Sequence, residues 1–99
     1  MGHKDNKFFE YVWKVRPHVC QECGRELKEM KKWYMHHILS KAKYPYFRHD
    51  ERNILMLCYQ HHNEIESATS APKLKVFPLQ EKIKQKLLAE VGYEYEIKL

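Results

Sequence analysis

The sequence has no long apolar run. No segment approaches the ~20 apolar residues that a membrane-spanning helix needs, and residues 1–5 do not begin a signal-peptide core. Asn6 also departs from the pattern for N-myristoylation. We therefore expect an intracellular, cytoplasmic protein that has no membrane partner.

Cysteine is scarce as well. Two of the three cysteines lie close together as Cys20-x-x-Cys23, and the third is Cys58. In an intracellular protein, three thiols fit metal ligation better than a disulfide with one thiol left over. A redox pair or two ordinary buried cysteines are the alternatives. A redox pair normally opens a helix within a βαβ unit, a pattern that this sequence does not have.

The composition favours one small globular domain over residues 1–99. A chain of 99 residues buries roughly 60–65% of its unfolded surface, so its core is marginal and a structural metal would matter. Apolar residues make up 43% of the chain and aromatic residues 13%, which argues against disorder. The net charge of +5 and the pI near 9.1 favour a polyanion as partner, although many basic domains of this size bind no nucleic acid.

Apolar periodicity predicts a helix near each end of the chain. The first runs over 5–15, where Asp5 or Asn6 can cap its start and Arg16-Pro17 stops it. The second runs over 79–91 and ends at Gly92. Its expected apolar face comprises Leu79, Ile83, Leu87, Leu88 and Val91.

The middle of the chain predicts two strands followed by a short helix. The strands cover 33–38 and 54–57, the helix covers 59–68, and 40–52 is expected to form an ordered surface loop between the strands. Residues 93–99 alternate polar and apolar side chains, which predicts a half-buried C-terminal strand. The fold class is therefore α+β.

Four of the seven histidines form two adjacent pairs, His36-His37 and His61-His62. Such pairs can supply two imidazoles that hold a divalent metal and a further imidazole that is free to take a proton. Hydrolysis of a phosphodiester needs both, because the attacking water must lose a proton and a cation must stabilise the leaving oxygen.

The spacing divides these residues into two metal sets. Cys58-x-x-His61 repeats the spacing of Cys20-x-x-Cys23, so the two pairs together make a Cys₃His zinc site. His62 is the next residue on the expected helix, turned about 100° away, and can point towards the strands instead.

These pieces, in this order, resemble the HNH endonucleases, whose catalytic unit is a ββα-metal (His-Me finger) motif. The resemblance covers residues 18–66 and leaves a C-terminal extension, 72–99, that matches nothing familiar. The matching pieces are Cys20-x-x-Cys23, His36-His37-Ile38, Asn53-Ile54 and Leu57-Cys58-x-x-His61-His62-Asn63. The expected fold is thus a zinc-stapled ββα-metal domain flanked by an N-terminal helix and by a C-terminal helix and strand.

The resemblance also implies roles for individual residues. His36 and His62 would hold the catalytic divalent ion, His37 would be the general base, and Asn53 would orient His37 through a hydrogen bond. The structural zinc would be held by Cys20, Cys23, Cys58 and His61. His61 stands where the family usually has a fourth cysteine, so it stays open which of His61 and His62 binds the structural zinc and which binds the catalytic ion.

The expected cofactors are therefore structural Zn²⁺ and a catalytic ion, for which we expect Mg²⁺ or Mn²⁺, with Zn²⁺ or Ni²⁺ as alternatives. Glu66, one turn beyond His62, is a candidate third ligand, with a solvated glutamate as the alternative. Lys41, Lys43, Arg48 and Arg52 are candidate DNA contacts, with a solvated charged loop as the alternative.

The sequence as a whole predicts a metal-dependent endonuclease that nicks or cuts double-stranded DNA and leaves 5′ phosphate and 3′ hydroxyl ends, as the family usually does. Such nucleases are common in phages and mobile elements. The alternative is a non-catalytic zinc module that binds nucleic acid or protein. A homodimer, or a nuclease that works beside a larger partner protein, also stays open.

Overall fold

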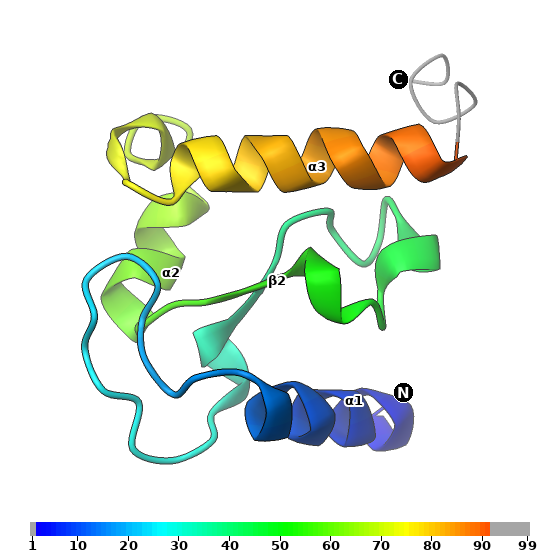
Figure 1. Cartoon of the computed structure of the whole chain (residues 1–99), viewed down its shortest axis with the longest axis horizontal. Helices are drawn as coiled ribbons and strands as arrows, with labels where there is room; N and C mark the ends of the chain where they lie inside the picture. The colour runs from blue at the N-terminus through cyan, green and yellow to red at the C-terminus, as the bar shows by residue number, and fades with distance from the viewer. Residues whose placement is uncertain (1, 92–99) are drawn as a thin grey trace.

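A computed structural model describes the backbone of residues 2–91 and the side chains of residues 4–91. It is an α+β fold, as predicted, and within these residues it has three α-helices and one two-stranded antiparallel sheet (Figure 1). The elements are α1 (Gly2–Val15), β1 (Met35–His37), β2 (Ile54–Met56), α2 (Tyr59–Ile65) and α3 (Phe77–Val91). The strand predicted over 93–99 and the stop at Gly92 lie outside the described residues.

The two short strands form the centre of the molecule, between α1 on one side and α3 on the other (Figure 1). In the pair, Met35 lies opposite Met56, and His37 lies opposite Ile54. All three residues of β2 are buried, which explains its continuous apolar sequence. Because successive side chains of a strand point to opposite faces, the side chains of His36 and His37 lie in different environments.

Helix α1 ends at Val15, as the following Pro17 predicts, but it begins earlier than expected. It starts at Gly2, so Asp5 lies inside the helix and does not cap it. The Asp5 carboxylate instead accepts hydrogen bonds from the side chains of Arg48 and His49. The predicted cap at this position was therefore wrong, because a long-range ion pair holds the carboxylate.

The segment 40–52 is ordered, as predicted, but it contributes to the core and is not merely a surface loop. It contains 3₁₀ turns at Pro45–Phe47 and Glu51–Asn53. Tyr44 and Phe47 are buried in a second apolar cluster, which also contains Leu87 from α3. The aromatic residues of this segment therefore support α3.

Helix α3 packs through Ile83, Leu87, Leu88 and Val91 of the predicted apolar face, but not through Leu79. Leu79 is 42% exposed, whereas Gln80 is only 7% exposed. Gln80, Ile83 and Leu87 are three and four residues apart, so they share one face, and Leu79 lies about 100° from Gln80. The prediction for Leu79 was wrong because it extended the apolar stripe beyond the contact. Neither α3 nor any other helix in the described part of the chain is long and apolar enough to cross a membrane.

The segment between α1 and β1 forms a tight knuckle around the first cysteine pair. Gly24 has a φ of 78°, a left-handed conformation that favours glycine, and its N–H donates to the Cys20 carbonyl at 2.8 Å. Glu22, inside the knuckle, accepts hydrogen bonds from the backbone N–H groups of Lys75 and Val76, at 3.0 and 2.9 Å. The knuckle is therefore tied directly to the start of α3.

Candidate metal and active site

The three cysteines and His61 converge at the base of the hairpin. Ligand atoms of all four residues lie within 4.8 Å of one another. Cys23 Sγ is 3.9 Å from Cys58 Sγ, and His61 Nδ1 is 3.2 Å from Cys58 Sγ. In a tetrahedral zinc site, ligand atoms lie about 3.4 to 3.8 Å apart, so this cluster can hold a zinc ion.

The electrostatics of the knuckle favour thiolate. Burial of the Cys20 thiol acts to raise its pKa, but hydrogen bonds from surrounding N–H groups, that of Cys58 foremost, outweigh the burial and lower the pKa to about 7. Burial raises the pKa of Cys58, the second of the two buried cysteines. A cation at the centre of the cluster would favour both thiolates, as zinc sites require.

A second cluster lies where β1 meets α2, and it consists of His36, His62 and Glu66. The Glu66 carboxylate lies 3.1 Å from His62 Nε2 and 3.8 Å from His36 Nδ1. The rings of His36 and His62 meet edge to face with centroids 5.4 Å apart. Ligand atoms bound about 2.1 Å from one ion lie about 3.0 to 3.4 Å apart, so the His62–Glu66 separation already suits a shared divalent ion, and His36 Nδ1 would need to move closer by a few tenths of an ångström.

One buried atom strengthens the case that the second cluster binds a divalent ion. His36 Nδ1 is buried and has no hydrogen-bond partner among the described residues. A buried polar atom without a partner is costly, and here the atom faces a carboxylate and a second imidazole. The donor set of two imidazoles and one carboxylate therefore fits a divalent metal, and it supports Glu66 as a third ligand.

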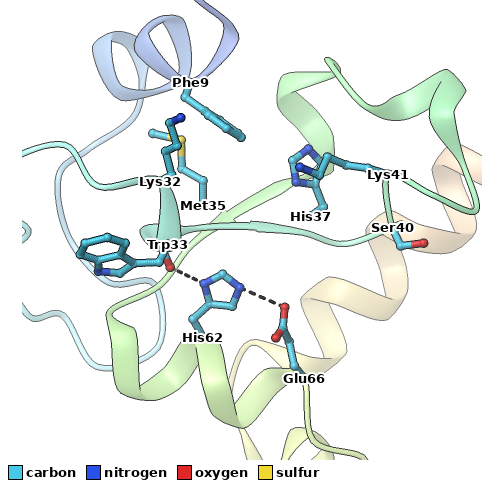
Figure 2. A pocket seen from close by; sticks show the side chains of 9 residues that line it. All are labelled: Phe9, Lys32, Trp33, Met35, His37, Ser40, Lys41, His62 and Glu66. Atoms are coloured by element: carbon cyan, nitrogen blue, oxygen red, sulfur yellow. Dashed lines mark hydrogen bonds and ion pairs between the residues drawn. The ribbon is translucent and has the colours of Figure 1, made fainter. Parts of the chain in front are cut away.

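The ring nitrogens that point away from this cluster are held by hydrogen bonds. His36 Nε2 donates to the side-chain oxygen of Gln80 at 2.8 Å, and His62 Nδ1 donates to the Trp33 carbonyl. Figure 2 shows His62 between the Trp33 carbonyl and Glu66. Each imidazole thus directs its other nitrogen towards Glu66, and an outer hydrogen bond of this kind is the arrangement expected for metal-binding histidines.

His37 is held by a different partner on the other face of β1. Its Nε2 donates to the Arg48 carbonyl at 2.9 Å, which leaves Nδ1 as the basic nitrogen. Burial lowers the pKa of His37, although the Arg48 carbonyl acts in the opposite direction. A neutral imidazole with one free basic nitrogen can accept a proton from water.

His37 shares one pocket, of about 490 Å³, with His62 and Glu66 of the second cluster, whereas His36 lies behind its lining. Figure 2 shows His37 and Lys41 on one side of this pocket and His62 and Glu66 on another. The exposed Lys32 and Lys41 bring positive charge to its lining. The pocket thus combines a base, potential metal ligands and basic side chains.

The environment of Asn53 differs from the expectation. Its side chain is completely buried and bonds to backbone groups: Oδ1 accepts from Leu39 N at 2.8 Å, and Nδ2 donates to the carbonyls of Leu39 and Phe47. Both N–H groups of the amide are therefore used by carbonyl oxygens. The expected direct hydrogen bond to His37 is replaced by a clamp on the chain that leaves β1.

Two of the four expected DNA contacts are already engaged in ion pairs. Arg48 binds Asp5, and Arg52 binds Asp50 and Glu90. Lys41 and Lys43 are exposed. Lysines 41 and 43 therefore remain the better candidates for phosphate contacts.

Three groups that contact the site were not predicted from the sequence: Asp5, Gln80 and the Trp33 carbonyl. Asp5 and Gln80 lie in the flanking helices, and a backbone carbonyl leaves no trace in residue identity. One signal was available for Gln80, which is a polar residue three and seven positions before Ile83 and Leu87 on the same helix face.

Comparison with known families gives a match to the middle of the chain. Residues 20–67 match the family model described as HNH endonuclease. Comparisons with curated proteins and with solved structures give no match. The matched range contains both ligand clusters, His37 and Asn53, whereas α1 and α3 lie outside it.

Proposed function

Because the chain belongs to the HNH endonuclease family through residues 20–67, we propose that it is a metal-dependent DNA endonuclease with His37 as general base. Membership of the family implies a nuclease type of function and a nucleic-acid substrate. The assignment of roles to individual residues rests on the geometry of the site, and the choice of DNA follows the resemblance to the family.

One observation carries the proposal: the imidazoles of His36, His37 and His62 have complementary hydrogen bonding. His36 and His62 each donate one N–H outward and keep the other nitrogen near Glu66. His37 donates its N–H to Arg48 and keeps Nδ1 free. Two nitrogens are thus suited to a cation and one to a proton.

The proposed reaction is hydrolysis of a phosphodiester bond. A divalent ion held by His36, His62 and Glu66 would supply positive charge beside the scissile phosphate and the departing 3′ oxygen. His37 accepts the proton of the attacking water at Nδ1, while its Nε2–H stays bonded to the Arg48 carbonyl. Mg²⁺ or Mn²⁺ suits a set that mixes imidazole with carboxylate and leaves room for water.

The second cluster belongs to the scaffold in this proposal. Cys20, Cys23, Cys58 and His61 would bind structural Zn²⁺ and fix α2 relative to the hairpin. His62, the neighbour of His61, is thereby presented to His36. The two adjacent histidines can bind different metals because their side chains project from α2 in directions about 100° apart.

The decisive test is cleavage of supercoiled plasmid in Mg²⁺ or Mn²⁺ by wild-type protein and by His37→Ala. We expect the variant to lose nicking by at least about 100-fold, the usual contribution of a general base, while its zinc content stays unchanged. His18→Ala is the matched control, since His18 is exposed and stacks on Trp13 away from the pocket.

Unimpaired nicking by His37→Ala would overturn the assignment of the base. Wild-type protein that shifts DNA on a gel but never cuts it with any divalent ion would favour the alternative, a non-catalytic zinc module. Linear and branched DNA in the same assay would define the substrate further.

A further inference from the structure

Gln80 is a buried polar residue on the otherwise apolar face of α3. It is 7% exposed, and its side-chain oxygen lies 2.8 Å from His36 Nε2. Gln80 comes from outside the segment that matches the HNH family, which ends at residue 67. A helix beyond the family motif therefore contacts a proposed metal ligand directly.

The contact selects one form of the imidazole. A neutral histidine carries its proton on either Nδ1 or Nε2, and the nitrogen without the proton is the one that can bind a metal. The Gln80 oxygen can only accept, so the proton resides on His36 Nε2. The free lone pair is then on Nδ1, the buried atom 3.8 Å from the Glu66 carboxylate.

We propose that Gln80 is a positioning residue that fixes His36 in its metal-binding tautomer, so that α3 is part of the catalytic metal site. The inference rests on the metal site of the proposed function. The inference extends that function, because it makes α3, which lies outside the family motif, necessary for the affinity of the site for its divalent ion.

A purely structural role for Gln80 makes a different prediction. Ile83 and Leu87 share its face and pack against apolar clusters, so an apolar side chain at position 80 would suit packing at least as well. A tautomer-fixing role instead requires an acceptor opposite His36 Nε2. The substitutions Gln80→Met and Gln80→Glu separate the two roles, since methionine keeps the volume and glutamate keeps the acceptor.

The experiment is calorimetric titration of zinc-loaded full-length protein with Mn²⁺. We expect Gln80→Met to weaken Mn²⁺ binding by about 10- to 100-fold, the usual effect of losing the outer partner of a metal-binding histidine. Gln80→Glu should bind within about threefold of wild type or more tightly, because a carboxylate is a stronger acceptor. Gln85→Met is the matched control, since Gln85 is exposed on the same helix.

A second measurement reads the tautomer itself, without metal or substrate. Long-range ¹H–¹⁵N spectra report which ring nitrogen carries the proton, and we expect Nε2–H at His36 in wild type and Gln80→Glu. In Gln80→Met we expect the Nδ1–H form to appear. Circular dichroism and zinc content of each variant establish that it is folded.

Three outcomes would overturn the inference: Mn²⁺ affinity unchanged in Gln80→Met, equal losses in both variants, or wild-type binding that His36→Ala does not abolish. Failure of the proposed function is a separate result. Wild-type protein that binds Mn²⁺ with the expected dependence on Gln80 but cuts no DNA would refute the nuclease and leave the role of Gln80 intact.

Discussion

The Asp5 carboxylate accepts two hydrogen bonds from the Arg48 guanidinium, 3.0 Å from Nε and 2.6 Å from Nη2. The backbone carbonyl of the same arginine holds His37 at 2.9 Å. Asp5 belongs to α1, outside the segment that matches the family. The base of the proposed reaction is thus supported through Arg48 by the N-terminal helix.

Replacing Asp5 should therefore affect both stability and activity. In Asp5→Asn, the hydrogen bonds to Arg48 lose their charge, and we expect the free energy of unfolding to fall by about 2 kcal/mol. We also expect a reduced kcat with little change in KM, because the Arg48 carbonyl is less firmly placed. Urea unfolding and plasmid nicking measure the two effects. Glu10→Gln, an exposed change on the same helix, should alter neither.

The stability effect of Asp5 should depend on pH in a defined direction. Hydrogen bonds from Arg48 and then His49 hold the Asp5 pKa well below its ordinary value. A lowered carboxyl pKa stabilises the folded state above the unfolded-state pKa, about 3.9, and this stabilisation is lost as the pH falls further. The gap between wild type and Asp5→Asn should thus be constant from about pH 6 to 8 and shrink below about pH 4. A gap that widens between pH 8 and pH 6 would contradict this.

Removal of zinc should unfold the protein. Structural zinc sites contribute about 10 to 16 kcal/mol of apparent binding free energy, more than a core of this size supplies. We expect a chelator to abolish the helical circular dichroism signal and Zn²⁺, but not Mg²⁺, to restore it. Cys58→Ser, which removes a buried ligand, should behave like the chelated protein. Helical signal that persists in zinc-free protein would argue against a structural role.

Asn53 should behave as a structural residue as well as one needed for activity. Asn53→Ala removes the partners of the buried Leu39 N–H and carbonyl, while the Phe47 carbonyl keeps its bond from the Asp50 N–H, and we expect a loss of about 3 kcal/mol in unfolding free energy. An Asn53 that acted only on His37 would lower activity without this loss. Urea unfolding decides between the two, with the exposed Asn63→Ala as control.

Lys41 and Arg52 should differ in their effects on DNA binding. Lys41 lines the pocket, so Lys41→Ala should weaken binding to every sequence and lower the salt dependence by about one released ion. Arg52 is engaged by Asp50 and Glu90, so Arg52→Ala should leave DNA affinity nearly unchanged. Fluorescence anisotropy at several salt concentrations, in the His37→Ala background, provides the measurement. Equal losses in both variants would contradict this distinction.

Local patterns predicted those parts of the fold that depend on local chemistry. Pro17 marked the end of α1 because proline cannot continue a helix, and the apolar run 54–57 marked the buried strand β2. The spacing of Cys20, Cys23, Cys58 and His61 predicted a cluster that the structure brings together. Ligand spacing is informative because an ion fixes the geometry that its ligands must meet.

Features that depend on contacts distant in sequence could not be read in this way. The role of Asp5 requires Arg48, and the orientation of α3 requires the aromatic cluster under Leu87. Asn53 was expected to bond to His37, but its partners are backbone groups that no pattern of side chains reveals. The flanking helices were predicted as elements, while their contacts with the site depend on tertiary packing.

Glu22 lies between Cys20 and Cys23, two of the proposed zinc ligands, and its carboxylate anchors the residues that lead into α3. The same helix carries Gln80 to His36. If the proposed function holds, loss of zinc from the knuckle would also release the helix that prepares the second cluster. The proposed catalytic ion would then be lost together with the fold.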